Sequence, residues 1–279
     1  MYEIQSSIFH KVKELLDKVE FNTLFAQSVI KNHVSGQVFT DDISHPKTAY
    51  IRHPYGMSLL VGCHTNEKFN RWLLDYISGR SDRMHSDDWM QVAPFEWNKV
   101  IEKGLIHNEI NRYVEKCTRV NFSFNCKRYE KLKEQLDYKN VKIEKMNHSQ
   151  FMKFKGKVIP RHFWDNYEDF DRKGMAYTAL ENDDIASIAY SAYVHGNKLE
   201  IGIETAEKYR NKGYALKACS RLIDYCIIND MDPVWACKLE NTSSYRLASR
   251  LGFDEKARYP YYGLMNPHLL NNKNRAVYL

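Results

Sequence analysis

The stretch TAEKYRNKGYALKACSRLIDYC, residues 205–226, joins the end of a strand-like pattern to a long amphipathic helix pattern. Its apolar residues recur every three or four positions, as on the buried face of a helix. A helix that only packs usually begins with a Ser, Asp or Asn cap, whereas Arg210, Lys212 and Gly213 open this one. Cations at that end oppose the helix dipole, so the pattern predicts a bound anion there.

The segments around this stretch alternate between strand and helix. Strand-like runs at 175–180, 185–194 and 198–205 precede the helix of about 212–229. A short strand at 234–237, a helix from Asn241 and a strand entered at Phe253 follow it. We therefore expect a mixed α/β sheet in which strands 198–205 and 234–237 are parallel neighbours, joined by a right-handed crossover.

The first half of the chain has a similar order of elements. A helix near 5–20 is followed by strand-like pieces at 36–40, 47–51 and 57–62, a helix at 66–77 and a strand at 119–125. No cationic Gly-bearing loop precedes the helix at 66–77, and Glu67 lies in its first turn. A polar segment at 137–150 predicts a boundary, which gives domains 1–138 and 139–279.

Composition excludes several classes of protein. The 279 residues carry a mild net charge of +6, and we find no Lys/Arg stripe, so we expect no nucleic-acid partner. No apolar run is long enough to span a bilayer, so we expect no membrane partner. The six cysteines form no CxxC and no metal-binding set, which favours a reducing, cytoplasmic location and no metal site.

A strand end, a Gly-containing turn and a helix N-terminus together suit a phosphate group. The first backbone N–H groups of a helix have no intrahelical partner, and Gly213 lets an anion approach the chain closely. The N–H groups of residues 211–216 would make the main contacts. The pattern is neither GxxxxGK[ST] nor GxGxxG, so a mononucleotide loop or a Rossmann loop is not indicated.

The same residues resemble a known family. Arg210, Gly213 and Ala215 match the R/Q-x-x-G-x-G/A pattern of the GNAT superfamily of acyl-CoA N-acetyltransferases, and the helix from Asn241 to Gly252-Phe253 matches a second element. The resemblance covers residues of about 145–262. Within the GNAT superfamily, the sequence resembles more specifically a bacterial branch that includes zwittermicin A resistance acetyltransferase. In that branch the N-terminal half resembles a degenerate second GNAT fold, which is the fold we expect here.

This resemblance implies acetyl-CoA as the acetyl donor. Pantetheine would lie in a splay between the strands ending at Thr205 and Cys237, held by backbone at 203–205. Asn241 and Ser244 would reach the donor from the second helix. The full set implied to bind it is Ile203, Thr205, Arg210, Asn211, Lys212, Gly213, Tyr214, Ala215, Leu216, Asn241 and Ser244.

Transfer to an amine needs a base, and the leaving thiolate can use an acid. Glu204, nearest the splay, is our candidate base, although Glu200 and Glu204 could equally form a plain solvent-facing side of the strand. Many GNAT enzymes carry an acidic Tyr at the position of Ala248. Tyr245, one turn earlier, is the candidate acid, with half-buried packing as its alternative. Tyr261 and Tyr262 are further candidates.

The acceptor is less well defined by the sequence. Trp164 and Trp235 suit either an acceptor wall or a core. An acidic cluster suits either a cationic amine or a solvated helix face; its members are Asp165, Glu168, Asp169 and Asp171.

We expect direct acetyl transfer to a primary amine of a small molecule or peptide, with antibiotic, polyamine and amino-acid amines all open and antibiotic resistance as one outcome. The alternative is a catalytically weak acyl-CoA-binding or sensing module. The first domain would shape the acceptor site or an interface, such as that of a homodimer.

Overall fold

The structure is a computed structural model that describes residues 1–78, 87–107, 114–139 and 141–265. The chain divides into two compact units. The first unit consists of Met1–Arg119 and a C-terminal segment that begins at Arg258, and the second consists of Val120–Ala257. The sequence suggested a single boundary after residue 138. The compact units divide at two places because β6 (Val114–Phe124) and β13 (Phe253–Leu264) each begin in one unit and end in the other, and the domain boundary after residue 138 stays a prediction.

The first unit holds an α/β sheet of mixed direction. Its neighbouring strands are antiparallel except for β4 and β5, which are parallel. The order is β1 (Tyr2–Glu3), β2 (Gln37–Thr40), β3 (Thr48–Arg52), β4 (Met57–Gly62), β5 (Asp88–Ala93) and the end of β13. Strands predicted at 36–40, 47–51 and 57–62 are thus confirmed, whereas β5 was missed.

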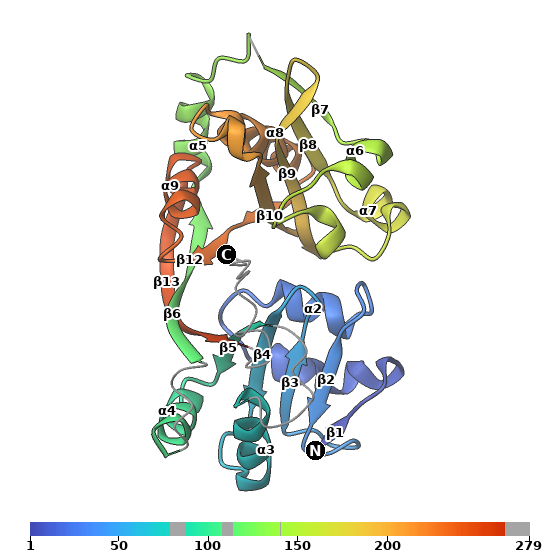
Figure 1. Cartoon of the computed structure of the whole chain (residues 1–279), viewed down its shortest axis with the longest axis vertical. Helices are drawn as coiled ribbons and strands as arrows, with labels where there is room; N and C mark the ends of the chain where they lie inside the picture. Colours follow the sequence, from blue (N-terminus) through green and yellow to red (C-terminus); the bar gives the residue numbers. More distant parts are fainter. Residues whose placement is uncertain (79–86, 108–113, 140, 266–279) are drawn as a thin grey trace. The chain divides into compact units, whose positions relative to one another are not determined.

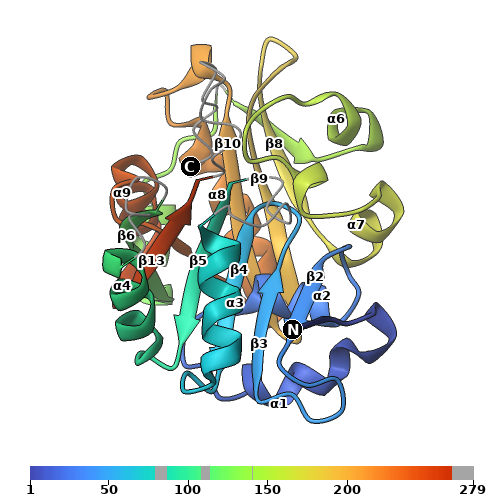
Figure 2. The same ribbon diagram turned by 60° about the horizontal axis from the view of Figure 1, so that its bottom comes forward.

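Helices cover both faces of this sheet (Figure 2). One face packs against α3 (Glu67–Ile77) and α4 (Trp97–His107) through a core that includes Tyr50, Leu73 and Trp97. The other carries η1 (Ser6–Val12), α1 (Lys13–Leu16) and α2 (Leu24–Ile30). The single helix predicted near 5–20 is therefore a 3-10 turn followed by a short α-helix.

The second unit contains a five-stranded sheet with helices on both faces (Figure 1). Its order is β11 (Asp232–Val234), β10 (Lys198–Thr205), β9 (Asp184–His195), β8 (Ala176–Glu181) and β7 (Lys142–Lys145). One face packs against α8 (Tyr214–Ile228). The other carries α6 (His148–Lys153), η3 (Pro160–His162) and α7 (Tyr167–Lys173).

Three more strands complete the second unit. β12 (Ala236–Lys238) pairs with β6, where the Phe122 N–H donates to the Trp235 carbonyl over 3.1 Å, and β6 in turn lies beside β13. These strands and α8 bury a common core with α9 (Thr242–Arg250), while α5 (Cys126–Lys133) contributes Tyr129. The run predicted as a strand of the first domain therefore ends in the core of the second unit.

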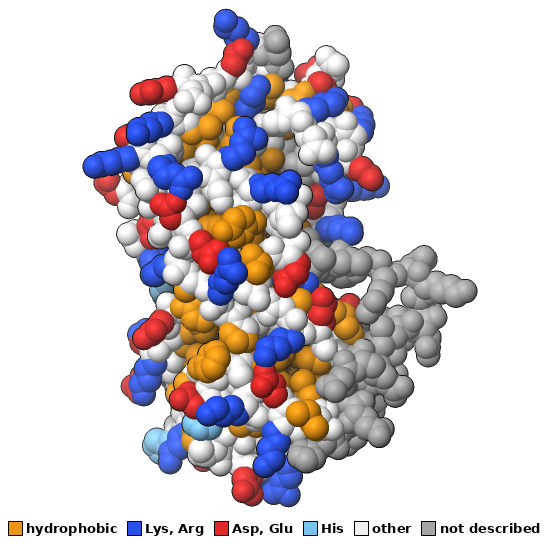
Figure 3. All heavy atoms as spheres, turned by 90° about the vertical axis from the view of Figure 1, so that its left-hand side faces the viewer, with side chains coloured by type: hydrophobic (Ala, Val, Ile, Leu, Met, Phe, Trp, Pro, Cys, Tyr) orange, Lys and Arg blue, Asp and Glu red, His pale blue; other side chains and the backbone are white. Residues whose placement is uncertain are grey.

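Two general features concern the described residues as a whole. No helix among them has the length and apolar composition needed to cross a membrane. Acidic and basic side chains are interspersed on the face shown in Figure 3.

Candidate active site

β10 and its parallel neighbour separate partway along their length. They pair only from Lys198↔Asp232 to Glu200↔Val234, after which β12 turns to pair with β6. Beyond Glu200, β10 keeps β9 on one edge only, and the β9–β10 register shifts between Glu200 and Ile201. Among the described residues, this fork leaves one edge of residues 201–205 without a strand neighbour, and such an edge can pair with an extended chain.

The first unit provides a comparison. Its parallel strands β4 and β5 stay in register from Met57↔Trp89 to Val61↔Ala93, so no fork opens there. The N-terminus of α3 is also occupied, because the Asn66 side chain accepts the Phe69 N–H at 3.1 Å and Glu67 lies in the first turn. In the part of the first unit that the structure describes, neither a gap between strands nor an uncapped helix end is present at this place.

The loop after β10 is built for a close approach to its backbone. Asn211 and Gly213 both have left-handed backbone conformations, with φ of 63° and 83°. Gly213 is the N-cap of α8 and offers no side-chain cap, so the first helical bond runs from the Lys217 N–H to the Gly213 carbonyl at 3.2 Å. A Cβ placed on Gly213 would meet no described atom within 4 Å. Among the described residues, the space beside the Gly213 Cα at the uncapped end of α8 is therefore open.

Two tyrosines hold this loop against the β8–β9 hairpin. Tyr209, in η4 (Glu207–Tyr209), donates its hydroxyl to Asp184 over 3.0 Å, and Tyr214 hydrogen-bonds to Glu181. The bond to Glu181 raises the pKa of Tyr214 to about 12, and it lowers the pKa of Glu181. Lys212 Nζ lies 3.4 Å from Glu181 Oε2. The side chain of Tyr214 thus supports the loop, and only its backbone is placed to meet a ligand.

The other residues implied to bind the donor have varied surroundings. Arg210 is exposed, Ala215 is half-buried and Leu216 belongs to the core. Thr205 Oγ1 lies 2.8 Å from Ser187 Oγ, which fixes it to β9. Ile203 packs against the core that contains α8, which places its neighbours Gly202 and Glu204 toward the opposite face.

The N-terminus of α9 is capped by the side chain of its own N-cap residue, Asn241. Asn241 Oδ1 accepts the Ser244 N–H at 3.1 Å, and Ser244 Oγ accepts the Trp235 indole N–H at 3.2 Å. The side-chain NH2 of Asn241 has no partner among the described residues, so this amide keeps donors for a ligand.

Glu200 and Glu204 do not form a plain solvent-facing surface. Glu200 is only 5% exposed and lies at the fork, as the last β10 residue paired with β11. Glu204 is half-buried, and its Oε2 accepts the backbone N–H groups of Lys157 and Val158 at 3.0 and 2.8 Å. The solvent-face alternative is therefore wrong for Glu200, and the carboxylate of Glu204 is already engaged by a loop.

The candidate acids are all held by neighbours. Tyr245 donates its hydroxyl to Glu255 Oε2 over 2.8 Å, and its ring lies 5.3 Å from that of Phe122. Tyr262 is buried in the first unit and donates to Asn98 over 2.6 Å. Tyr261 is 3% exposed and its ring lies 5.4 Å from that of Trp89. Packing thus accounts for Tyr261 and Tyr262, and Tyr245 is the one of the three that lies on α9.

The residues considered for the acceptor are engaged within the second unit. Trp164 and Trp235 are both buried, and the Trp164 indole donates to the Ser191 carbonyl at 2.8 Å. In the acidic cluster, Asp169 pairs with Arg172 and Lys173, while Asp171 pairs with Lys145. These ion pairs favour the solvated helix face over a site for a cationic amine.

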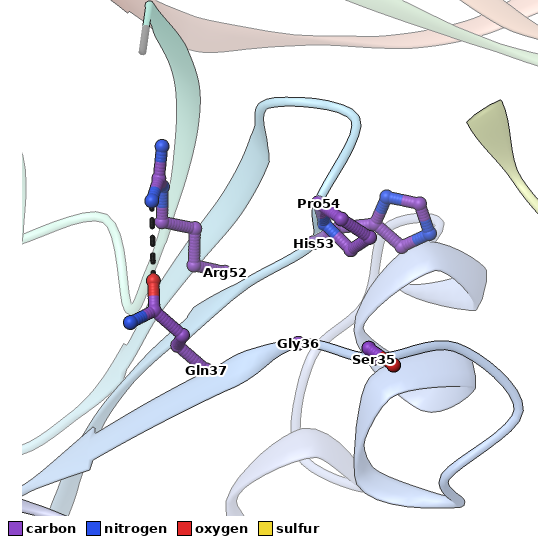
Figure 4. Close-up of a pocket in the computed structure, with 6 residues that line it drawn as sticks. All are labelled: Ser35, Gly36, Gln37, Arg52, His53 and Pro54. Carbon is purple, nitrogen blue, oxygen red and sulfur yellow. Dashed lines mark hydrogen bonds between the residues drawn. The ribbon is translucent and has the colours of Figure 1, made fainter. Parts of the chain in front are cut away.

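A pocket of about 290 Å³ lies elsewhere, in the first unit (Figure 4). Arg52 Nη1 donates to Gln37 Oε1 at 3.1 Å, and Arg52 Nε lies 3.4 Å from the buried carboxylate of Asp88. The lining residues are Ser35, Gly36, Gln37, Arg52, His53 and Pro54. Arg52, the charged residue of this lining, is thus held by its neighbours within the first unit.

No group of His, Cys, Asp and Glu among the described residues is arranged to hold a metal ion.

Comparison with known proteins agrees with this geometry. Residues 13–262 match the GNAT acetyltransferase family. The chain is 25% identical over 271 residues to the uncharacterized N-acetyltransferase YdfB of Bacillus subtilis (strain 168), covering 94% of this chain and 98% of that protein.

Solved structures show the same fold. A GCN5-related N-acetyltransferase-like protein from Streptococcus suis superposes with a TM-score of 0.68 at 17% identity, over 92% of this chain and 98% of that one. A tandem GNAT protein from the clavulanic acid biosynthesis pathway gives a TM-score of 0.59 at 8% identity, over 95% and 97%. The predicted fold, a GNAT domain with a second GNAT-like lobe, is confirmed, and the narrower branch stays a prediction.

Proposed function

Because the chain belongs to the GNAT acetyltransferase family, we propose that it transfers an acetyl group from acetyl-CoA to a primary amine of a small molecule or peptide. One observation carries the proposal. The fork beyond Glu200 and the uncapped N-terminus of α8 occur together in the second unit, on either side of the loop that joins β10 to α8. The described residues of the first unit have neither feature at the equivalent place.

The donor would be bound mainly by backbone. The N–H groups at the start of α8 suit the pyrophosphate, and Arg210 and Lys212 add positive charge. The free edge of Ile203–Thr205 suits pantetheine, and its N–H groups would polarise the acetyl carbonyl. Asn241 and Ser244 would contact the donor from α9.

Direct transfer requires a neutral amine beside the thioester. We propose Glu200 as the base, since it is buried at the fork, next to the edge of β10 along which the thioester would lie. For Tyr245 to protonate the leaving thiolate, its hydroxyl must leave Glu255. The ammonium formed from the acceptor is the other source of that proton.

The experiment is to incubate the protein with acetyl-CoA and a panel of antibiotic, polyamine, amino-acid and peptide amines. Free thiol release and the mass of the product report transfer. We expect release that depends on the amine, with initial-rate patterns that intersect as in a ternary complex. Parallel patterns with an acetylated protein would contradict direct transfer.

The engaged hydroxyl of Tyr245, together with Ala248 in place of a Tyr, favours one alternative. A sensing module would bind acetyl-CoA and release no thiol with any of the amines. Binding without turnover across the panel would therefore replace the enzyme by this second function.

A further inference from the structure

The carboxylate of Glu204 makes hydrogen bonds that a general base does not need. One oxygen, Oε2, accepts two consecutive backbone N–H groups, from Lys157 and Val158, at 3.0 and 2.8 Å. The backbone of Glu204 is fixed as well, because Ser187 Oγ donates to its carbonyl at 3.0 Å. A carboxylate in such charge-assisted bonds ties the two segments firmly.

The segment that Glu204 holds also packs closely on it. Residues 155–158 link α6 to η3, and a Cβ added to Gly156 would come within 2.6 Å of Glu204 Cγ and 3.0 Å of Cδ. Such separations are shorter than normal carbon contacts, so position 156 requires glycine while Glu204 keeps this conformation. The N–H bonds and this contact together define a clamp of Glu204 on residues 155–158.

The clamp extends to an ionisable side chain. The Lys157 carbonyl lies 3.1 Å from His162 Nδ1, at the end of η3. Burial lowers the pKa of His162 and is the main influence on it; the Lys157 carbonyl raises that pKa, the Arg161 charge lowers it and the Glu204 charge raises it. Glu204 is therefore linked to His162 through the segment that it holds.

We propose that Glu204 is a positioning residue, whose carboxylate fixes residues 155–158 and His162 beside the end of β10 and takes no proton from the amine. The part of this proposal that concerns the acceptor rests on the proposed function above. Residues 155–158 then form a wall for the acceptor next to the fork, and loosening that wall weakens acceptor binding more than it slows the chemical step.

Amide hydrogen–deuterium exchange tests the clamp without any reference to catalysis. In the wild type we expect protection of the Lys157 and Val158 amides. Glu204→Ala removes both acceptors and should raise exchange there by about tenfold or more. Glu204→Gln keeps an acceptor oxygen and should raise it less. Gly156→Ala, whose Cβ displaces Glu204, should behave like Glu204→Ala, and the exposed Glu168→Gln is the control for loss of charge.

Kinetics with an amine that the enzyme accepts then separates positioning from proton transfer. Glu204→Ala and Gly156→Ala should raise the acceptor KM by about fivefold or more with a smaller change in kcat. Glu204→Gln should keep the wild-type shape of the pH profile of kcat. A loss of about a hundredfold in kcat for Glu204→Gln, with unchanged exchange at 157–158, would make Glu204 the base and overturn the proposal.

Unchanged exchange in Glu204→Ala would remove the clamp itself. If the wild type acetylates no amine, the proposed function fails while the exchange measurement still decides whether the clamp exists.

Discussion

Gly213→Ala should separate the stability of the protein from its affinity for acetyl-CoA. Gly213 has φ of 83°, where an alanine costs roughly 1–2 kcal/mol relative to glycine. For a chain of 279 residues that cost corresponds to a fall in Tm of roughly 2–4 °C. The new methyl group meets no described atom within 4 Å, so no further clash adds to this cost. It does stand at the uncapped end of α8, where the pyrophosphate must approach the backbone.

The expected result is a small loss of stability with a large loss of affinity. Isothermal calorimetry should show the Kd for acetyl-CoA rising about tenfold or more, equivalent to about 1.4 kcal/mol. The matched control is Gly196→Ala in the β9–β10 turn, since Gly196 also has a positive φ (58°) and no described atom within 4 Å of an added Cβ. Equal Kd values for the two variants would refute the assignment of the α8 N-terminus as the phosphate site.

Three further predictions concern ligand binding, proton transfer and pH. Acetyl-CoA at about 100 times its Kd should stabilise the protein by about 2.7 kcal/mol, which a thermal shift measures; no shift at millimolar ligand would remove the donor assignment. Tyr245→Phe should lower stability by about 1 kcal/mol, because its bond to Glu255 is lost, and should lower kcat less than about tenfold; a hundredfold loss of kcat at unchanged Tm would identify Tyr245 as the acid. Burial lowers the pKa of His53 to about 3 from 6.5, so its contribution to stability is complete above pH 6.5 and is lost as pH falls toward 3. Between pH 6.5 and 5 that loss is about 2 kcal/mol, and it should be absent in His53→Asn, whose side-chain oxygen can still accept the Tyr55 N–H; identical slopes of stability against pH in denaturant unfolding would contradict this.

The second unit was the easier part to predict from sequence. Helical spacing and turn residues placed the helix at 212–229, observed as Tyr214–Ile228, and the strand at 198–205 with its observed bounds. The crossover to a parallel neighbour was correct, but the neighbour is β11 (Asp232–Val234), which pairs only with Lys198–Glu200. The strand predicted at 234–237 was wrong as that neighbour, because its last residues lie in β12, which pairs with β6. Local periodicity determines such elements, whereas the length of pairing depends on partners far along the chain.

The partners of β6 show what local patterns cannot provide. Val120 and Phe122 alternate as in any half-buried strand, and the sequence does not state that their core lies in the second unit. β5 was missed because a polar stretch precedes it and its own residues include Asp88 and Gln91, which are nonetheless buried.

At the site, backbone features were predictable and side-chain contacts were not. The R-x-x-G-x-A pattern indicated the uncapped helix, because a glycine and cations at a helix N-terminus do little to stabilise the helix itself. The clamp of Glu204 on residues 155–158 depends on a contact across more than forty positions. The glycine in KGK at 155–157 was the only sign of this clamp in the sequence. The reason for that glycine cannot be inferred without knowing where Glu204 lies.

The most direct test of the account is a crystal structure of the protein grown with acetyl-CoA. The account predicts the pyrophosphate on the backbone N–H groups of residues 211–216, with pantetheine along the free edge of residues 201–205. Density for the donor at the N-terminus of α3, at residues 66–68, or beside β4 would contradict it.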